Sequence, residues 1–350
     1  MEKPALLYEK LDGGKVRCKL CARYCTIARG RKGFCLVRKN KGGKLFTESY
    51  GKSTGLQLDP IEKKPFYHFK PNTQVLSFGT PGCNFRCLNC QNWDLSQGLQ
   101  DGVDFDALPF TSAESIAKTA VECKADGVAY TYSEPTIFFE YACDTVFETR
   151  KISSDKFHVF VSNGYFSKEM FELVQKERLF NAIRIDLKFV EDDKYLQVCS
   201  GSLKPVKESI ERVYAAKKTS RPVHLELIAL VIPSLNDSPD QLQRLAKFVA
   251  SIGKDIPIHF IRFFPHYKMQ SVPMTSDDTL LQAKKIAEAE GLEYVFVGNT
   301  SLKGSEDTRC PKCREILVKR RAMSVSENKL QKRGGKVVCF KCGEEINLVL

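Results

Sequence analysis

Residues 79–93 read GTPGCNFRCLNCQNW, and this stretch decides how the rest of the chain is interpreted. Its three cysteines, Cys83, Cys87 and Cys90, have CxxxCxxC spacing and directly follow the apolar run 75–78. A structural zinc site needs four ligands in a closed tetrahedron, and a four-iron, four-sulfur cluster is usually held by four cysteines. Three cysteines on one loop therefore predict a cluster with one iron open to another ligand. The alternative is a zinc site completed by a distant residue such as His68.

Outside this loop, residues 75–300 alternate short apolar runs with amphipathic stretches. Several of the amphipathic stretches begin with Ser or Asp, which cap helix N-termini. Alternation of this kind predicts an α/β fold with a parallel sheet. Six or seven such units favour a partial (β/α)6-type barrel, and a doubly wound open sheet is the alternative. Strands are predicted at 75–78, 127–132, 157–162, 183–188, 223–230, 258–263 and 293–298, and helices at 112–126, 167–177, 204–218, 238–252 and 276–291.

Polar residues follow the predicted strands, where α/β proteins bind their ligands. Glu134 follows the second strand, Asn163 the third, and Asp186 and Lys188 end the fourth. Their placement behind the cysteine loop predicts a shared site. The alternatives are a helix cap for Glu134, a turn for Asn163 and a surface ion pair for Asp186 and Lys188.

Three residues near the end of the sixth predicted strand are weaker candidates for contacts with substrate or cofactor. They are Arg262, His266 and Tyr267, within RFFPHYKM. Core packing and a salt bridge are the alternatives for these residues.

Two further cysteine groups flank the predicted barrel. Clustered cysteines in a reducing compartment indicate metal or redox chemistry more often than disulfides. The C-terminal group has two CxxC pairs, which predict a zinc ribbon, with a cluster as the alternative. The N-terminal group is also a complete four-ligand set, for zinc or for a second iron–sulfur cluster that would relay electrons, and its short Gly-punctuated segment favours zinc. The ligands are Cys310, Cys313, Cys339 and Cys342 in the first group and Cys18, Cys21, Cys25 and Cys35 in the second.

The charge of the chain is uneven. The net charge is +12, and residues 1–74 contain 17 Lys/Arg against 6 Asp/Glu, whereas residues 75–300 contain 25 against 30. Residues 301–350 contain 12 against 6. This pattern suggests contact with a polyanion such as RNA, and solvated lysines are the alternative. We expect three domains, a basic N-terminal metal-binding module with four cysteine ligands (1–74), the barrel (75–300) and the ribbon (301–350).

The N-terminal residues lack an apolar signal core, and no apolar run approaches the roughly 20 residues that span a membrane. We therefore expect a cytoplasmic protein without a membrane partner. The other three cysteines, Cys123, Cys143 and Cys199, lie among apolar neighbours and are expected to be inert core thiols.

The CxxxCxxC loop after the first strand resembles the signature of the radical S-adenosylmethionine superfamily. The resemblance implies that the amino and carboxylate groups of S-adenosylmethionine chelate the open iron of a 4Fe-4S cluster. Reductive cleavage then yields a 5′-deoxyadenosyl radical that abstracts hydrogen from a substrate. It also implies that Glu134 binds the methionine amine, that Asn163 lies near the ribose, and that Lys188 of the DLK motif approaches the methionine carboxylate. The glycine pair that usually precedes the glutamate is missing, and Asn89 replaces the usual aromatic residue.

The blocks YEKLDGGKVRCKLCARYCTIARGRKGFCLVRKNKGGKL, CQNWDLSQ, VIPSLNDS and IHFIRFFPHYKM resemble one group of that superfamily. This group is the radical enzyme of the AmmeMemoRadiSam system, related to pyruvate formate-lyase activating enzymes. The resemblance implies AMMECR1-like and Memo-like partners and a ferredoxin- or flavodoxin-type electron donor. We expect a macromolecular substrate, with RNA modification as the favoured reaction. The alternatives are activation of a glycyl-radical enzyme and a non-catalytic metal-binding scaffold.

Overall fold

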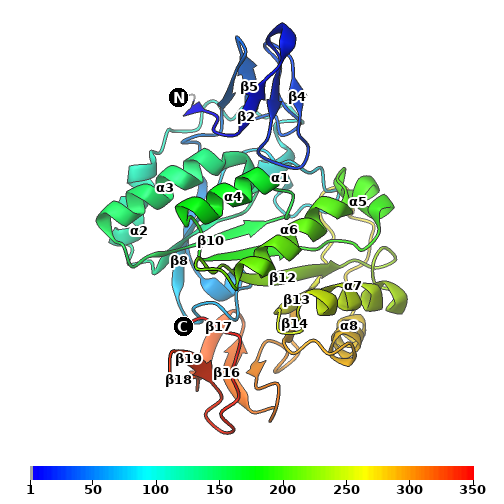
Figure 1. Cartoon of the computed structure of the whole chain (residues 1–350). Coiled ribbons are helices and arrows are strands. Elements are labelled where there is room, and N and C mark those ends of the chain that lie inside the picture. Colours follow the sequence, from blue (N-terminus) through cyan, green and yellow to red (C-terminus); the bar gives the residue numbers. More distant parts are fainter. Residues whose placement is uncertain (1–2) are drawn as a thin grey trace.

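The structure, a computed structural model, describes residues 3–350 and is built around one eight-stranded sheet (Figure 1). Every strand predicted between residues 75 and 300 is present. An additional strand, β7 (Thr54–Pro60), pairs antiparallel with β8 at one edge. Strand β7 lies within residues 1–74, which we assigned to the N-terminal module, but it belongs to the central sheet. The boundaries of the three domains stay a proposal. The other strands are β8 (Gln74–Gly79), β9 (Gly127–Tyr130), β10 (Phe157–Ser162), β11 (Ala182–Asp186), β12 (His224–Val231), β13 (Ile258–Arg262) and β14 (Val295–Gly298).

Strands β8 to β14 are parallel and lie in the sheet in the order in which they occur in the chain. The doubly wound alternative is therefore wrong, since that fold reverses its strand order at a switch point. Helices connect successive strands and pack on one face of the sheet. They are α1 (Trp93–Gln97), α2 (Ala113–Glu122), η3 (Pro135–Phe138), α3 (Phe139–Ile152), α4 (Lys168–Glu177), α5 (Asp192–Cys199), α6 (Leu203–Ala216), α7 (Pro239–Ile252) and α8 (Asp277–Ala289).

Serine caps start four of the predicted helices. Ser112, Ser167, Ser238 and Ser276 each accept a hydrogen bond from the backbone N–H three residues later. A cap of this kind is worth about 1 kcal/mol to its helix. The caps confirm the helix starts that the sequence predicts.

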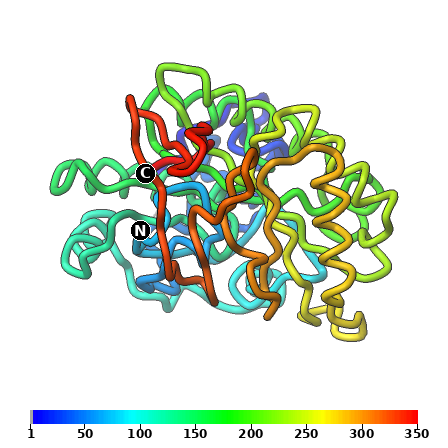
Figure 2. Tube along the Cα trace, turned by 90° about the horizontal axis from the view of Figure 1, so that it is seen from below, coloured from blue at the N-terminus to red at the C-terminus, as the bar shows by residue number. Residues whose placement is uncertain are grey.

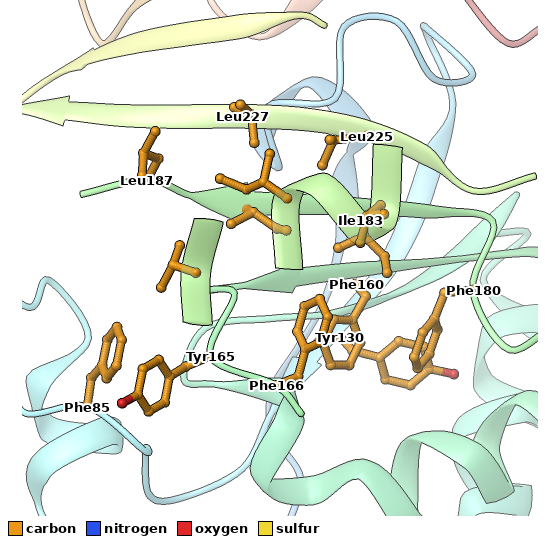
Figure 3. Packing of buried hydrophobic residues seen from close by; sticks show 14 of the residues in the cluster. Phe85, Tyr130, Phe160, Tyr165, Phe166, Phe180, Ile183, Leu187, Leu225 and Leu227 are labelled. Atoms are coloured by element: carbon orange, nitrogen blue, oxygen red, sulfur yellow. The ribbon is translucent and has the colours of Figure 1, made fainter. Parts of the chain in front are cut away.

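Aromatic side chains fill the layer between the sheet and the helices (Figure 3). The rings of Phe160 and Phe180 lie 4.6 Å apart, and Tyr130 meets Phe180 edge-on at 5.4 Å. The layer reaches the cysteine loop, because Phe85 packs on Tyr165 with ring centroids 4.9 Å apart. Burial of each such ring contributes about 1.5–3 kcal/mol, so the loop is fixed to the core of the fold.

The opposite face of the sheet is concave and is filled from below by residues 61–69, which include the short helix η2 (Ile61–Lys63). Glu226 of β12 anchors this segment, because its carboxylate accepts hydrogen bonds from the backbone N–H groups of Tyr67 (3.0 Å) and His68 (2.8 Å). His259 donates to the same carboxylate at 2.7 Å. Alternate β12 residues share a face, so Ile228 and Leu230 point to the same side as Glu226, farther along the strand.

The two cysteine-rich segments lie at opposite ends of the molecule (Figure 1), and in the view from below the C-terminal segment lies in front of the sheet (Figure 2). No helix among residues 3–350 has both the length and the apolar character needed to cross a membrane. The N-terminal strands are β1 (Lys3–Pro4), β2 (Tyr8–Lys10), β3 (Val16–Cys18), β4 (Thr26–Ile27), β5 (Arg38–Lys41) and β6 (Lys44–Thr47), with the turn η1 (Asp12–Gly14). The C-terminal strands are β15 (Thr308–Arg309), β16 (Ile316–Arg321), β17 (Ser324–Asn328), β18 (Gln331–Arg333) and β19 (Lys336–Val338).

Candidate functional site

A cavity of about 470 Å³ opens at the carboxyl ends of the parallel strands. This is where the sequence places the site, and the cavity brings together residues from four successive strand ends. Its floor is formed by Glu62 and Tyr67 of the segment that fills the concave face. The predicted site residues in its wall are Cys83, Cys87, Cys90, Glu134, Asn163, Asp186 and Lys188.

The cysteine loop presents its three thiols to this cavity. The backbone N–H of Phe85 donates to Cys83 Sγ at 3.3 Å, and Cys90 Sγ lies 3.1 Å from the hydroxyl of Ser96 on α1. Cys199, predicted to be an inert core thiol, lies next to the loop: a hydrogen bond from it lowers the pKa of Cys87, against the effect of burial. Each of the three thiols therefore lies beside a group that can donate a hydrogen bond to it.

The donor set fits a cluster with an open iron better than it fits zinc. Among the residues that line the cavity, the only cysteines are the three of this loop. They do not belong to any group of ligand atoms that all lie within 4.8 Å of one another in residues 3–350, as the atoms around a single zinc ion must. His68, the alternative fourth ligand, lies outside the cavity wall, and its ring nitrogens contact Asn347 O at 2.8 Å and Thr308 Oγ1 at 3.3 Å.

Glu134 lies at the start of η3 and is almost completely buried. Its Oε1 accepts from Thr136 N (3.1 Å), Thr136 Oγ1 (2.5 Å) and Ser162 Oγ (2.7 Å), and its Oε2 accepts only from Asn163 N (2.7 Å). Burial raises the pKa of Glu134, while these donors act in the opposite direction. Glu134 therefore does cap a helix, as in the alternative reading. A second lone pair on Oε2 remains for a cationic ligand group.

Asp186 and Lys188 form an ion pair in the cavity wall and not on the outer surface. Lys188 Nζ lies 3.0 Å from Asp186 Oδ2, and Arg184 Nη2 lies 2.8 Å from Oδ1. Burial opposes ionisation of both partners, but their mutual attraction outweighs it, so the pKa of Asp186 is lowered and that of Lys188 is raised. Asp186 thus holds a charged ammonium group in the wall of the cavity.

Asn163 also lines the cavity, but its side chain is used within the protein. Its Nδ2 donates to Asn84 Oδ1 at 2.7 Å, and its Oδ1 accepts from Tyr165 N at 3.0 Å. It positions the loop next to Cys83, and the predicted contact with a ribose stays a prediction. Asn89 lines the cavity too, with a buried Oδ1 that has no partner among the described residues.

The three weaker candidates lie outside the cavity wall. Arg262 forms an ion pair with Asp277, which is the salt-bridge alternative. Tyr267 stacks on the half-exposed Trp93, with ring centroids 5.3 Å apart and planes at 9°. His266 accepts the backbone N–H of Met269 through its carbonyl at 3.0 Å. Direct contact of these residues with a ligand in the cavity is not supported by this placement.

The C-terminal cysteines converge on one point. Cys310 Sγ lies 3.6 Å from Cys342 Sγ, Cys313 Sγ lies 3.7 Å from Cys339 Sγ, and all four sulfurs are within 4.8 Å of one another. Zn–S bonds of about 2.3 Å in a tetrahedron put the sulfurs about 3.8 Å apart. The N-terminal cysteines, in contrast, surround a small cavity of their own.

Two features of the cavity were not predicted. Lys64 lines it and is held by Asp59 at 2.7 Å, and burial lowers the pKa of Lys64 to about 8 despite that carboxylate. Met323 reaches it from the tip of the β16–β17 hairpin, where Ala322 and Met323 have φ values of 48° and 66°. Left-handed φ is uncommon for residues other than glycine. The only sequence signal for this turn would have been that it has no glycine where a hairpin usually has one.

The chain has relatives among known proteins. The model of the radical SAM superfamily matches residues 78–249. An uncharacterized protein of Methanocaldococcus jannaschii is 40% identical over 347 residues, which is 99% of each chain. Among solved structures, a domain of the pyruvate-formate lyase-activating enzyme from Bacteroides vulgatus is 20% identical with a TM-score of 0.41, covering 49% of this chain and 99% of that one. A radical SAM methyltransferase from Sphaerobacter thermophilus is 13% identical with a TM-score of 0.47, covering 66% and 67%.

Proposed function

Because the chain belongs to the radical SAM superfamily, we propose that the 470 Å³ cavity is its active site, with a 4Fe-4S cluster held by Cys83, Cys87 and Cys90. The superfamily implies an iron–sulfur cluster and cleavage of S-adenosylmethionine. When bound, these two groups supply a 5′-deoxyadenosyl radical that abstracts hydrogen from a substrate. The sequentially ordered sheet is then the partial barrel that the sequence predicts.

The residues in the cavity wall have separate tasks in this proposal. Glu134 Oε2 accepts a hydrogen bond from the methionine ammonium group, since it has one protein donor and a free lone pair. Lys188, kept charged by Asp186, faces the methionine carboxylate. Both residues lie in one wall with the three thiols, and this juxtaposition is the observation that carries the proposal.

The test is turnover of S-adenosylmethionine by protein reconstituted anaerobically with iron and sulfide and reduced with dithionite. We expect 5′-deoxyadenosine and methionine in equal amounts, and we expect Cys87→Ala to abolish both products. Cys123→Ala is the matched control, because Cys123 lies at the end of α2, outside the cavity wall. Intact S-adenosylmethionine with the wild-type protein would favour the non-catalytic scaffold.

For the substrate we propose RNA. The hairpin whose tip lines the cavity carries the exposed cations Lys319 and Arg321 on either side of the buried Arg320, and neither exposed cation forms a salt bridge within residues 3–350. Unpaired cations beside an active-site mouth would attract phosphate groups. The surplus of Lys/Arg in residues 301–350 supports the same choice.

Two measurements separate RNA from a glycyl protein. Affinity for RNA should fall as salt rises, and the double variant Lys319→Gln/Arg321→Gln should reduce the slope of log Kd against log salt by about 1–2. Mass spectrometry of cells without the gene should show the loss of one RNA modification. Unchanged RNA together with the loss of a backbone glycyl radical signal from a partner protein would favour the activase.

We further propose that the C-terminal cysteines bind one zinc ion. The 3.6 and 3.7 Å sulfur separations support this, since they match a zinc tetrahedron. Membership of the AmmeMemoRadiSam group, with AMMECR1-like and Memo-like partners, rests on the sequence blocks quoted above. Co-purification of tagged protein from its native cells tests the partners.

A further inference from the structure

We propose that the N-terminal cysteines, Cys18, Cys21, Cys25 and Cys35, hold an iron–sulfur cluster and not the zinc ion that the sequence favoured. All four thiols line one cavity of about 20 Å³ between β3, β4 and the loop before β5. The proposal goes beyond the proposed function, because it concerns a second site whose ligands are all separate from the cysteine loop at 83–90.

In this structure the N-terminal thiols are spaced more widely than in a closed zinc site, because no three of their sulfurs all lie within 4.8 Å of one another. Around zinc each sulfur lies about 2.3 Å from the centre of the tetrahedron, so no space for a water molecule remains inside. The cavity that these cysteines line together with Arg38 and Asn84 has about 20 Å³, more than the roughly 10–15 Å³ that a water molecule needs. In the same structure, the C-terminal cysteines close to zinc distances.

The N-terminal set shares its wider spacing with the cysteine loop of the proposed active site. Within residues 3–350, only the C-terminal ribbon has three or more metal-ligand atoms that all lie within 4.8 Å of one another. Four thiols around a void are the donor set of a cluster, whose irons occupy the centre and keep the sulfurs apart.

Buried hydrogen-bond donors without partners line the same cavity. Arg38 is 1% exposed, and its Nη2 pairs with Glu140 while its Nε and Nη1 have no partner among the described residues. Asn84 is fully buried and its Nδ2 also has no partner. An unpaired buried donor costs about 1–3 kcal/mol. N–H groups around an anionic cluster donate to its sulfurs, and such bonds tune cluster potentials, so the three orphan N–H groups are explained by a bound cluster.

The cavity lies directly against the active-site loop. Asn84 lines it and follows Cys83 in the chain, and Arg86 donates to Cys83 O at 2.9 Å and to Phe34 O. A cluster held by these cysteines would accept one electron from a reduced ferredoxin or flavodoxin, which would thereby be oxidised by one electron, beside the Cys83 loop.

The experiment uses the full chain with Cys83, Cys87 and Cys90 all replaced by alanine, so that failure of the proposed active site does not affect the result. After anaerobic reconstitution with iron, sulfide and zinc supplied together, we expect two or four irons per chain, an equal amount of acid-labile sulfide, and one zinc. Further replacement of Cys18 and Cys35 by alanine should remove the iron and sulfide, whereas Cys143→Ala in the same background should keep them. Two zinc ions per chain and no iron in the first variant would overturn the proposal.

The wild-type chain gives a second readout in case the variants do not fold. Reconstituted wild-type protein should carry two or four irons in addition to the four of the 4Fe-4S cluster, and the reduced sample should show two cluster signals by electron paramagnetic resonance. S-adenosylmethionine should perturb one signal and leave the other unchanged. A single signal with iron for one cluster would overturn the proposal, even if that cluster cleaves S-adenosylmethionine.

Discussion

Replacement of Glu134 by glutamine tests the active-site proposal most directly. The carboxylate accepts three hydrogen bonds on Oε1 and one on Oε2. A glutamine keeps the three donors only if its carbonyl oxygen replaces Oε1, which turns the amide NH₂ toward the backbone N–H of Asn163. Donor then faces donor, and one buried hydrogen bond is lost at a cost of about 1–3 kcal/mol to the loop after β10.

The larger expected effect is on ligand affinity. A hydrogen bond to a charged group is worth about 1.5–3 kcal/mol, and the proposed partner of Oε2 is an ammonium group. At about 1.4 kcal/mol per factor of ten, Glu134→Gln should weaken binding of S-adenosylmethionine by roughly 10- to 150-fold. Isothermal titration calorimetry on anaerobically reconstituted proteins of equal iron content measures this loss.

Thr136→Val is the matched control for this measurement. It removes the hydroxyl that donates to Oε1 at 2.5 Å and leaves the carboxylate charged. We expect a smaller loss of affinity than for Glu134→Gln. Equal losses in the two variants, or affinity within about twofold of wild type for Glu134→Gln, would show that Glu134 only caps η3.

Four more variants address stability and the metal sites. Burial lowers the pKa of His158 to about 3, so its neutral form contributes stability that is complete above about pH 6.5 and is lost as the pH falls toward 3. His158→Gln should flatten the fall in the free energy of unfolding between pH 7 and 5, measured by urea titration, by up to about 1.4 kcal/mol per pH unit. Parallel curves for the two proteins would contradict this. Gly82→Ala would place a Cβ 2.9 Å from Cys35 O at φ +99° and should lower the iron content, whereas Gly13→Ala, at φ +66° with no atom within 4 Å, should keep it. Cys339→Ser should lose zinc and keep iron by elemental analysis, and loss of both metals would argue against separate sites. Cys199→Ala removes a hydrogen bond to Cys87 worth about 1 kcal/mol, so the potential of the cluster should fall by about 40 mV in a redox titration, while Cys199→Ser should restore most of it.

The parallel sheet was predictable because its strands are apolar on both faces and short, and because serine caps mark the helix starts. Helix α3 was missed for a physical reason. Its buried side includes Glu140, Thr145 and Thr149 beside Tyr141 and Val146, so polar residues interrupt the apolar period. The polar residues are buried because other segments satisfy them, as when Leu6 N donates to Glu140 at 2.9 Å.

The site was predictable as far as residues lie at strand ends, since parallel strands bring their carboxyl ends to one edge. Contacts that depend on packing between segments far apart in the sequence could not be predicted. Cys199 has apolar neighbours in the sequence, and only the packing of α5 places it beside Cys87. The metal at the N-terminal cysteines was undecided for the same reason, because spacing along the chain does not determine the distances between the sulfurs.

Met323 lies in the cavity wall and belongs to the same C-terminal segment as the cysteines that we propose to bind zinc. The hairpin that carries this side chain starts directly after the first knuckle of the ribbon, and its other anchor is Arg320, whose Nη2 donates to Tyr67 O at 2.6 Å. Without the proposed zinc ion, Arg320 and the pairing of β16 with β15 would still hold the hairpin, but the knuckle that precedes it would lose its metal. Loss of that ion would then act first on the cavity wall to which Met323 belongs, and not on the cysteine loop at 83–90.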